Sequence, residues 1–304
     1  MAEMTLRQER REARRAAKRA PKHKLTPRKL AVRILQYLVL SLIALYLIFP
    51  YIFMLNRSFM YPADIMTLPV KFFPPKLTLD GWVKMFEQNN YLLYTFNTLK
   101  IVCFNMIAVP LSASVCAYGF TKIRFPGRDF VFSATLATIM IPGAVTQVPL
   151  YIMFSRLGWV NGALCMTIPA LFGGGAVTIF LFMQFMRGIS FELENAAKID
   201  GANVFQRYAL ITMPLCWPII LYTVISTFSG GWSDFYGPLV YLKSREQYTL
   251  ALVIYYDSIN TNVAMEVANV RMAAGVFMSL PPLILFFLYQ KNLIEGIQVG
   301  AIKG

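Results

Sequence analysis

The sequence predicts an all-α membrane protein with six transmembrane helices. Hydrophobic residues make up 57% of the 304 residues and charged residues only 14%, whereas soluble domains contain about 45–50% apolar and about 25% charged residues. Several apolar stretches also reach the roughly 20 residues that a helix needs to cross a bilayer. A chain with so few charges cannot coat a water-soluble surface. These observations argue against a soluble enzyme and against a solvated disordered chain.

The six predicted spans lie where charged residues are missing from the sequence. They cover residues 34–55, 101–120, 130–155, 157–186, 215–233 and 272–289. We expect the fourth span to become helical from around Cys165 and the triplet Gly173-Gly174-Gly175 to loosen its first turns. The fifth span has room to continue through 235–242, because only Asp234 interrupts the apolar run there.

Basic residues in short flanking segments predict the orientation of the spans. Twelve lysines and arginines lie in the first 33 residues, so we expect this tail to stay in the cytoplasm. A basic stretch can bind nucleic acid or anionic lipid. We interpret this one as a topology signal that adheres to the inner leaflet, without a nucleic-acid partner. The long basic head and the full-length span after it predict an anchor, not a cleaved signal peptide.

The predicted topology divides the chain into a tail of residues 1–33, a membrane domain of residues 34–290 and a second tail of residues 291–304. With six spans, both tails face the cytoplasm. The loops 121–129 and 187–214 of the membrane domain face the same side, and three basic residues in the shorter loop agree with this.

The sequence offers no set of residues for catalysis or for metal binding. The four cysteines are widely spaced and the chain has one histidine, which argues against disulfides, zinc and iron–sulfur sites and favours buried thiols. The glycine triplet lacks the Gly-Lys-Ser/Thr of a phosphate loop, so we expect no ATP site of that kind in this chain. Asp234 is the one carboxylate that stands out in the spans, with Gln147 and Gln184 as neutral polar groups. A membrane enzyme and an ion-coupled secondary carrier stay open as alternatives, although neither finds its usual ionisable groups here.

The loop 187–214 is a polar, helix-favouring stretch between two spans. Ser190 is suited to cap a helix, and Glu192 and Glu194 suit its first turn. Small and apolar side chains at Ala196, Ala197, Ile199 and Ala202 form a stripe that lets another surface approach closely, and Gly201 permits a turn between two helical pieces. The pattern predicts a short docking helix on the cytoplasmic face. A plain surface helix that links two spans is the alternative.

The same loop resembles the signature of the permease subunits of binding-protein-dependent ABC importers, which reads Glu-Ala-Ala, three residues, Gly, nine residues, Ile-x-Leu-Pro. Here it stands as Asn195-Ala196-Ala197, Gly201 and Ile211-Thr212-Met213-Pro214, with every spacing kept. Asn195 stands where the signature has glutamate and Met213 where it has leucine. The resemblance therefore implies no contact between a carboxylate at position 195 and the ATPase. Glu194, the preceding residue, is expected to supply part of the negative charge of the signature glutamate.

The resemblance covers residues 30–304 and extends to five further segments, 117–128, 140–149, 158–161, 232–239 and 295–304. These look like the carbohydrate branch of the family, and like its smaller, maltose-type second permease subunit. The resemblance implies a six-span, multi-pass permease in the bacterial inner membrane that is a transport subunit and not an enzyme.

The resemblance also implies partners. They are a sister permease, two ATPase subunits that bind ATP and Mg²⁺, and an extracytoplasmic binding protein that delivers a carbohydrate, here an oligosaccharide. The chain itself would carry no cofactor. ATP-driven closure of the ATPases would move the loop helix and the C-terminal residues 295–304 and switch the spans between inward- and outward-facing states. A bacterial gene neighbourhood with a second permease and a binding protein would favour this over the two alternatives.

Two sets of residues are predicted to carry the function. The ATPase-coupling set is Glu194, Asn195, Ala196, Ala197, Asp200, Gly201 and Ala202. The substrate-pathway set on the fifth span is Tyr222, Thr223, Ser226, Thr227, Ser229, Trp232 and Asp234, with Ser233 and Tyr236 beside it, because sugars are held by hydrogen bonds and aromatic faces. Each Ser or Thr has the alternative of bonding to its own helix carbonyl, and each aromatic that of an interfacial belt position. Trp232 and Asp234 have the further alternatives of shaping an outer gate or contacting the binding protein, and the sister subunit is implied to hold most of the substrate.

Overall fold

The computed structural model describes residues 27–87, 90–259 and 267–301, and the side chains of residues 28–87, 90–259 and 267–290. It divides into two units, residues 1–52 and 53–304, which are described separately. Most of the predicted basic tail lies outside the described residues.

The described part of the first unit is the beginning of helix α2 (Pro27–Ser58). The segment Arg28–Ser58 is long and apolar enough to cross a membrane, which confirms the first predicted span. Its apolar side chains are exposed, as at Tyr46 with 79% of its surface free. A helix with apolar side chains exposed all round is what a span facing lipid requires.

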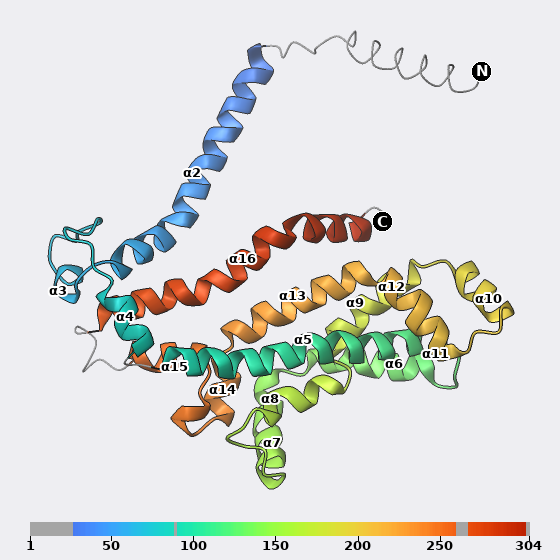
Figure 1. Ribbon diagram of the computed structural model, residues 1–304. Helices are drawn as coiled ribbons and strands as arrows, with labels where there is room; N and C mark the ends of the chain where they lie inside the picture. The colour runs from blue at the N-terminus through green and yellow to red at the C-terminus, as the bar shows by residue number, and fades with distance from the viewer. Residues whose placement is uncertain (1–26, 88–89, 260–266, 302–304) are drawn as a thin grey trace, which may run out of the picture. The chain divides into compact units, whose positions relative to one another are not determined.

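Within its described residues, the second unit is helical and contains no strand (Figure 1). Its first half contains α3 (Pro62–Ile65), α4 (Asp80–Glu87), α5 (Tyr91–Lys122), α6 (Arg128–Ala137), η1 (Thr138–Met140), α7 (Gly143–Arg156), α8 (Leu164–Thr167), η2 (Ile168–Leu171) and α9 (Ala176–Arg187). Its second half contains α10 (Phe191–Ile199), α11 (Val204–Arg207), η3 (Tyr208–Thr212), α12 (Met213–Leu215), α13 (Trp217–Ser233), α14 (Tyr236–Tyr241), η4 (Arg245–Gln247), α15 (Leu250–Ile259) and α16 (Ala268–Ala301).

The predicted count of six spans is reached when two bent helix pairs are each counted as one span. Four helical segments of the described chain qualify singly, namely Arg28–Ser58, Tyr91–Lys122, Leu164–Arg187 and Ala268–Gln290. The third predicted span is bent by 101° between Arg128–Met140 and Gly143–Arg156, and the fifth lies in a pair bent by 75° between Val204–Leu215 and Trp217–Ser233.

Prolines explain both bends. Ile141 is extended, with φ −79° and ψ 115°, because the ring of the following Pro142 disfavours helical backbone at the preceding residue. At the second bend, Cys216 leaves the helical region, and Pro218, two residues later, occupies the first turn of α13. Proline has no N–H to donate, so the first turn of a new helix is where it fits.

The glycine triplet interrupts the fourth span as predicted. Gly173, Gly174 and Gly175 all have positive φ, at 88°, 61° and 97°, and α9 begins only at Ala176. A Cβ on Gly174 would lie 2.8 Å from the carbonyl oxygen of Val109 in α5. Glycine at 174 therefore satisfies both an unusual backbone angle and a close approach to α5.

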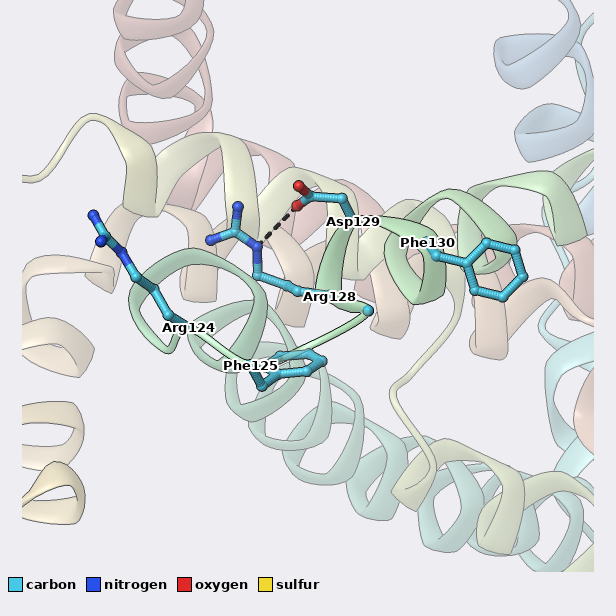
Figure 2. Close-up of a pocket in the computed structure, with 6 residues that line it drawn as sticks. Arg124, Phe125, Arg128, Asp129 and Phe130 are labelled. Atoms are coloured by element: carbon cyan, nitrogen blue, oxygen red, sulfur yellow. Dashed lines mark hydrogen bonds and ion pairs between the residues drawn. The ribbon is translucent and has the colours of Figure 1, made fainter.

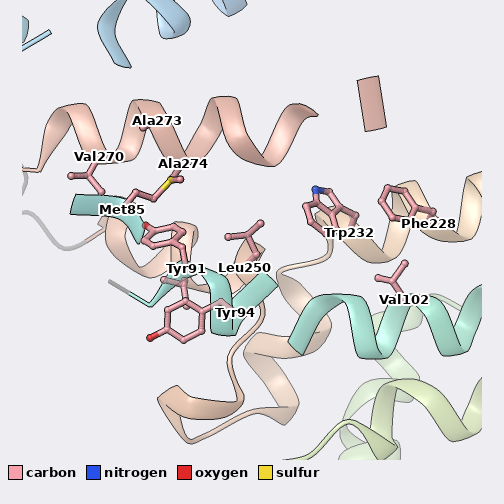
Figure 3. Close-up of a cluster of buried hydrophobic side chains, with 11 residues drawn as sticks. Met85, Tyr91, Tyr94, Val102, Phe228, Trp232, Leu250, Val270, Ala273 and Ala274 are labelled. Carbon is pink, nitrogen blue, oxygen red and sulfur yellow. The ribbon is translucent and has the colours of Figure 1, made fainter. Parts of the chain in front are cut away.

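Helix α5 is the centre of the second unit, where it packs against α13 and α9. One buried cluster joins it to α4, α13, α15 and α16 (Figure 3). Figure 3 labels Met85, Tyr91, Tyr94, Val102, Phe228, Trp232, Leu250, Val270, Ala273 and Ala274 of this cluster. A second cluster, which includes Ala113, Ala117 and Phe182, joins α5 to α9.

Two short helices differ from the prediction. Helix α14 lies where the fifth span was expected to continue, and α15 lies where a loop was expected. Helix α13 ends at Ser233, and the expected run through 235–242 forms the separate helix α14. Helix α15 lies in the predicted outer loop, and its Leu250, Leu252 and Val253 are almost fully buried. Ten residues are too few to cross a bilayer, so no membrane span was predicted for the sequence of α15.

The four cysteines are unpaired thiols. Cys165 and Cys216 are buried as predicted, whereas Cys116 is half-buried and Cys103 is exposed, so the prediction of buried thiols is wrong for Cys103. Cys103 lies in a predicted span, where an exposed thiol can face lipid as a small apolar group.

Candidate coupling surface and transport pathway

Helix α10 begins and ends as the loop sequence predicted. The hydroxyl of Ser190 accepts a hydrogen bond of 3.1 Å from the backbone N–H of Glu192, so Ser190 is the N-cap. Glu192 and Glu194 lie in the first turn, where negative charge is favoured by the helix dipole. The backbone N–H of Asp200 donates to the carbonyl of Ala196 at the other end.

Gly201 turns the chain between α10 and α11. Its φ is 84°, which glycine adopts at a helix end without the steric cost of a Cβ. The backbone N–H groups of Gly201 and Ala202 donate to the carbonyls of Lys198 and Ala197 and close the turn. Asn203 then starts α11 with a capping box, in which its side chain and that of Gln206 each bond the other's backbone N–H at 2.8 Å. The predicted pair of helical pieces is confirmed.

Helices α10 and α11 and the following turn η3 expose apolar side chains, here together called the α10–α11 surface. Its members include Phe191, Leu193, Ile199, Phe205 and Leu210, with 55%, 51%, 87%, 73% and 72% of their surfaces exposed. Asn195, Ala196, Asp200 and Gly201 of the predicted coupling set are exposed on the same two helices and their turn, whereas Ala197 and Ala202 are half-buried. Large apolar side chains gathered on a surface are typical of a binding site for another protein. Of these large side chains, only Ile199 was among the predicted residues.

Glu194 behaves differently from the rest of the predicted coupling set. Only 4% of it is exposed, so it faces the interior of this chain and not a partner. Its carboxylate accepts a 2.9 Å hydrogen bond from the hydroxyl of Thr212 and lies 3.8 Å from the ammonium of Lys122.

The predicted inner loop between α5 and α6 forms a basic hollow beside this region (Figure 2). It is lined by Arg124, Phe125, Gly127, Arg128, Asp129 and Phe130. Arg128 donates from Nε to the carboxylate of Asp129 at 2.9 Å, and Figure 2 shows the Arg124 side chain extending away from that pair. Helices α10 and α11 lie at the same end of α5 as this loop (Figure 1). The two predicted inner loops therefore lie at one end of α5.

The predicted pathway residues on α13 fall on two different faces. Tyr222 and Ser226 are exposed and Ser229 is half-exposed, and their spacing of four and three residues puts them on one face of the helix. Thr223 is buried and bonds back to the carbonyl of Ile219 at 2.8 Å, which is the alternative expected for a span threonine. Thr227 is half-buried. The exposed face is a polar stripe within an apolar helix.

Trp232 lies in the interior core of the unit and is only 2% exposed. Its ring stacks on Phe228 with a centroid separation of 5.6 Å, and its indole N–H donates to the carbonyl of Met278 in α16 at 2.7 Å. That carbonyl would normally accept from the residue four positions later, which is Pro282 and has no N–H. Trp232 thus supplies a donor that the proline removes.

Asp234 is exposed and holds the start of α14. Its Oδ1 accepts hydrogen bonds from the backbone N–H groups of Tyr236 and Gly237 at 2.9 and 3.1 Å. The hydroxyl of Tyr236 donates to the side chain of Gln147 in α7, the neutral polar residue noted in the third span. Oδ1 of the carboxylate is therefore bonded to the backbone at the start of α14, and Oδ2 takes part in neither of these two bonds.

Asn161 connects two loops that are far apart in the sequence. Its side-chain oxygen accepts from the backbone N–H groups of Lys243 and Ser244 at 2.9 and 2.8 Å, and its amide donates to the Ser244 hydroxyl at 2.7 Å. Its own backbone N–H donates to the carbonyl of Tyr241. In the family-like segment 158–161, Asn161 thus forms a hydrogen-bonded clamp that holds its own loop against residues 241–244.

An open cavity of about 420 Å³ lies at the opposite end of α5 from α10. It is lined by Arg245, Tyr248, Val253, Tyr256, Asp257 and Ile259. The hydrogen bond from Arg245 to the Tyr94 hydroxyl raises the pKa of the guanidinium above its usual value, and the charge of Asp257 adds to this. Burial raises the pKa of the Tyr248 phenol. No group of three or more His, Cys, Asp or Glu side chains able to hold a metal occurs in the described part of the chain.

These features define a multi-pass helical membrane protein with exposed apolar side chains on one loop. Residues 108–299 match the family described as binding-protein-dependent transport system inner membrane component, and the chain belongs to that family. The predicted family is therefore confirmed, and the chain is a transport subunit and not an enzyme.

Three relatives match most of the chain. The lactose transport system permease protein LacG of Rhizobium radiobacter is 29% identical over 89% of this chain and 96% of its own length. The arabinooligosaccharides transport system permease protein AraQ of Halalkalibacterium halodurans is 29% identical over 87% and 94%. The maltose/maltodextrin transport system permease protein MalG of Escherichia coli K12 is 30% identical over 70% and 73%.

Solved structures share the fold. A crystal structure of a bacterial ABC transporter involved in the import of the acidic polysaccharide alginate matches 88% of this chain with a TM-score of 0.78 at 20% identity. The alginate transporter in complex with an alginate pentasaccharide-bound periplasmic protein matches 84% with a TM-score of 0.56 at 16% identity. The predicted ABC importer permease fold is therefore confirmed.

Proposed function

We propose that this chain is the permease subunit of an ATP-driven importer that moves a carbohydrate, most specifically an oligosaccharide, into the bacterial cytoplasm. The observation that carries the proposal is that relatives aligned over about nine-tenths of this chain are named for lactose and arabinooligosaccharide transport. The chain is multi-pass and its location is the inner membrane, with both termini in the cytoplasm.

The partners follow from the same family membership. They are a sister permease, two ATPase subunits that bind ATP and Mg²⁺, and an extracytoplasmic binding protein that delivers the carbohydrate. A relative in fold was crystallised with a periplasmic protein carrying an alginate pentasaccharide, which supports the binding-protein partner. This chain carries no cofactor of its own in the proposal.

The α10–α11 surface is the proposed contact with an ATPase subunit. Ile199 and Phe205, with 87% and 73% of their surfaces exposed, supply apolar area, and the exposed Ala196 leaves room for a partner to approach the backbone. Asn195, Ala197, Asp200, Gly201 and Ala202 complete the contact or shape its turn. The C-terminal tail, residues 291–304, is proposed to reach the ATPase pair as well, and its side chains lie outside the described ones.

The polar stripe of α13 is the proposed part of the substrate pathway in this chain. Tyr222, Ser226 and Ser229 present hydroxyl groups on the exposed face, and sugars bind through hydrogen bonds to such groups. Thr223 and Trp232 support the helix from its buried face. Thr227 and Asp234 remain pathway candidates at the side and the end of the stripe.

The test is uptake by the purified complex in liposomes with its binding protein. Labelled lactose, maltotriose, galactotriose and arabinotriose form the panel, chosen from the relatives' names. We expect uptake of at least one sugar that requires internal ATP and persists with a protonophore. Uptake that needs no ATP and collapses with the ion gradient would identify a secondary carrier and refute the proposal.

Ala196→Trp tests the coupling surface. Because Ala196 is exposed, a bulky ring there will leave the fold of this chain intact and block docking. We expect at least a tenfold loss of ATP-driven uptake, with the chain still inserted in the membrane. Glu246→Trp, at an exposed position of η4, is the matched control and will keep normal uptake. Normal uptake in Ala196→Trp would refute this contact.

A further inference from the structure

Lys122 and Glu194 form a buried pair of opposite charges where α5 ends. Lys122 is the last residue of α5 and Glu194 lies in the first turn of α10. Their side chains are only 1% and 5% exposed, and the ammonium nitrogen lies 3.8 Å from the carboxylate oxygen Oε1. Lysine and glutamate are almost never buried without a partner. Most of the loop that contains Glu194 is exposed, whereas Glu194 is buried together with Tyr208 and Thr212.

The surroundings compensate both charges. The hydroxyl of Thr212 donates to Glu194 at 2.9 Å. Lys122 donates to the carbonyl of Ile189 at 3.3 Å, and its nitrogen lies 4.1 Å from the centre of the Phe191 ring, close enough for a cation–π interaction. Ile189 before α10 and Phe191 and Glu194 within it therefore converge on Lys122, and Thr212 after α10 bonds Glu194.

A second contact joins the same loop to α5. Tyr208 belongs to the π-helical turn η3, and its hydroxyl and that of Ser114 lie 2.8 Å apart. Its ring also meets Tyr118 edge-on, with a centroid separation of 5.3 Å. Single π-helical turns occur frequently at functional sites. Thr212, which bonds Glu194, is the last residue of this turn, so both contacts meet in η3.

We propose that Lys122 is a positioning residue that connects α10 rigidly to α5 through Glu194. In this proposal, which rests on the proposed function, a displacement of α10 by the ATPase moves α5, the central helix of the unit. The burial of Glu194 supports this role, because a carboxylate hidden in its own chain cannot contact the ATPase. Removing one partner of a buried pair leaves the other charge uncompensated, so each single change disturbs the connection.

The experiment compares Lys122→Met, Glu194→Gln and the swapped pair Lys122→Glu with Glu194→Lys in the purified complex. Lys76→Met and Glu246→Gln, at exposed positions away from α10, are matched controls. The readout is the number of sugars taken up per ATP hydrolysed, with the panel member that the unchanged complex transports best. A merely structural role would lower uptake and hydrolysis in proportion and leave this ratio unchanged.

We expect each single change to lower the ratio at least fivefold while hydrolysis stays within twofold, and the controls to match the unchanged complex. The swapped pair will recover at least half of the ratio because it restores opposite charges. An unchanged ratio in the single variants, or a swapped pair no better than either of them, overturns the proposal.

If the single variants do not assemble, Thr212→Val decides the matter. It removes the hydrogen bond to Glu194 without removing a charge, and we expect at least a twofold lower ratio, whereas an unchanged ratio overturns the proposal. A complex with the natural sequence that shows no ATP-driven uptake would instead refute the proposed function.

Discussion

Replacing Trp232 by Phe tests whether the indole N–H compensates for a proline in the neighbouring helix. The substitution keeps an aromatic ring against Phe228 and removes the donor to the Met278 carbonyl. A buried carbonyl without a donor costs about 1–3 kcal/mol. The smaller ring also leaves unfilled space, which adds about 1 kcal/mol. We expect Trp232→Phe to lower the free energy of unfolding by about 2–4 kcal/mol, the sum of these two effects.

A double-mutant cycle with Pro282→Ala separates the two effects. Alanine at 282 restores the backbone N–H that the Met278 carbonyl lacks, so in that background Trp232→Phe loses only the packing part. The interaction energy between the two positions is therefore expected to be about 1 kcal/mol or more.

The assay is unfolding of the purified chain by SDS in mixed micelles, followed by circular dichroism. Trp217→Phe is the matched control because 61% of Trp217 is exposed, and its effect is expected to stay within about 0.5 kcal/mol. Equal costs of Trp232→Phe with proline and with alanine at position 282 would refute the reasoning.

Three further predictions use the same unfolding assay. Asn161→Ala removes the three side-chain hydrogen bonds of the clamp and will cost about 1–3 kcal/mol; a cost below about 0.5 kcal/mol would contradict the clamp. Gly237→Ala places a Cβ 2.6 Å from the carboxylate of Asp234 and will cost about 1 kcal/mol by disrupting the start of α14. Gly230→Ala, which has open space at its Cβ, is the control and will not have this cost. Equal effects of the two substitutions would argue against the role of Asp234 at the start of α14. The hydrogen bond from Lys84 lowers the pKa of Asp80 in the folded protein. The stability that ionised Asp80 contributes is therefore present above the pKa of the unfolded state and is lost as the pH falls through the pKa of the folded state. Asp80→Asn will therefore flatten the acid dependence of the unfolding midpoint below about pH 4, and identical curves would contradict this assignment.

The spans and the coupling loop were predictable because their signals are local. An apolar run such as 101–120 identifies a span without knowledge of its neighbours, and α5 indeed covers it. Ser190 and Gly201 mark the start of α10 and the turn after it by their own chemistry, and both have the predicted roles. The bend at Pro142 was not predicted, because the apolar run 130–155 was taken as one span, although proline and the residue before it disfavour helix.

The roles of individual polar residues were not predictable because they depend on distant parts of the chain. Glu194 was grouped with the exposed coupling residues, and only its position beside Lys122 and Thr212 reveals that it is buried. Trp232 was grouped with the pathway, although Pro282 on another helix explains its hydrogen bond. Helix α15 was missed because its ten residues are too few for a span. Several of its side chains are buried in the folded core, which the local pattern does not reveal.

The buried pair at the end of α5 also has a consequence for biosynthesis. Lys122 leaves the ribosome before Glu194, so its ammonium group stays hydrated until the later loop arrives and covers it. Closure of this region is then a late event in maturation. An amine-reactive label that modifies Lys122 in nascent chains but not in the finished protein would distinguish immature from completed molecules.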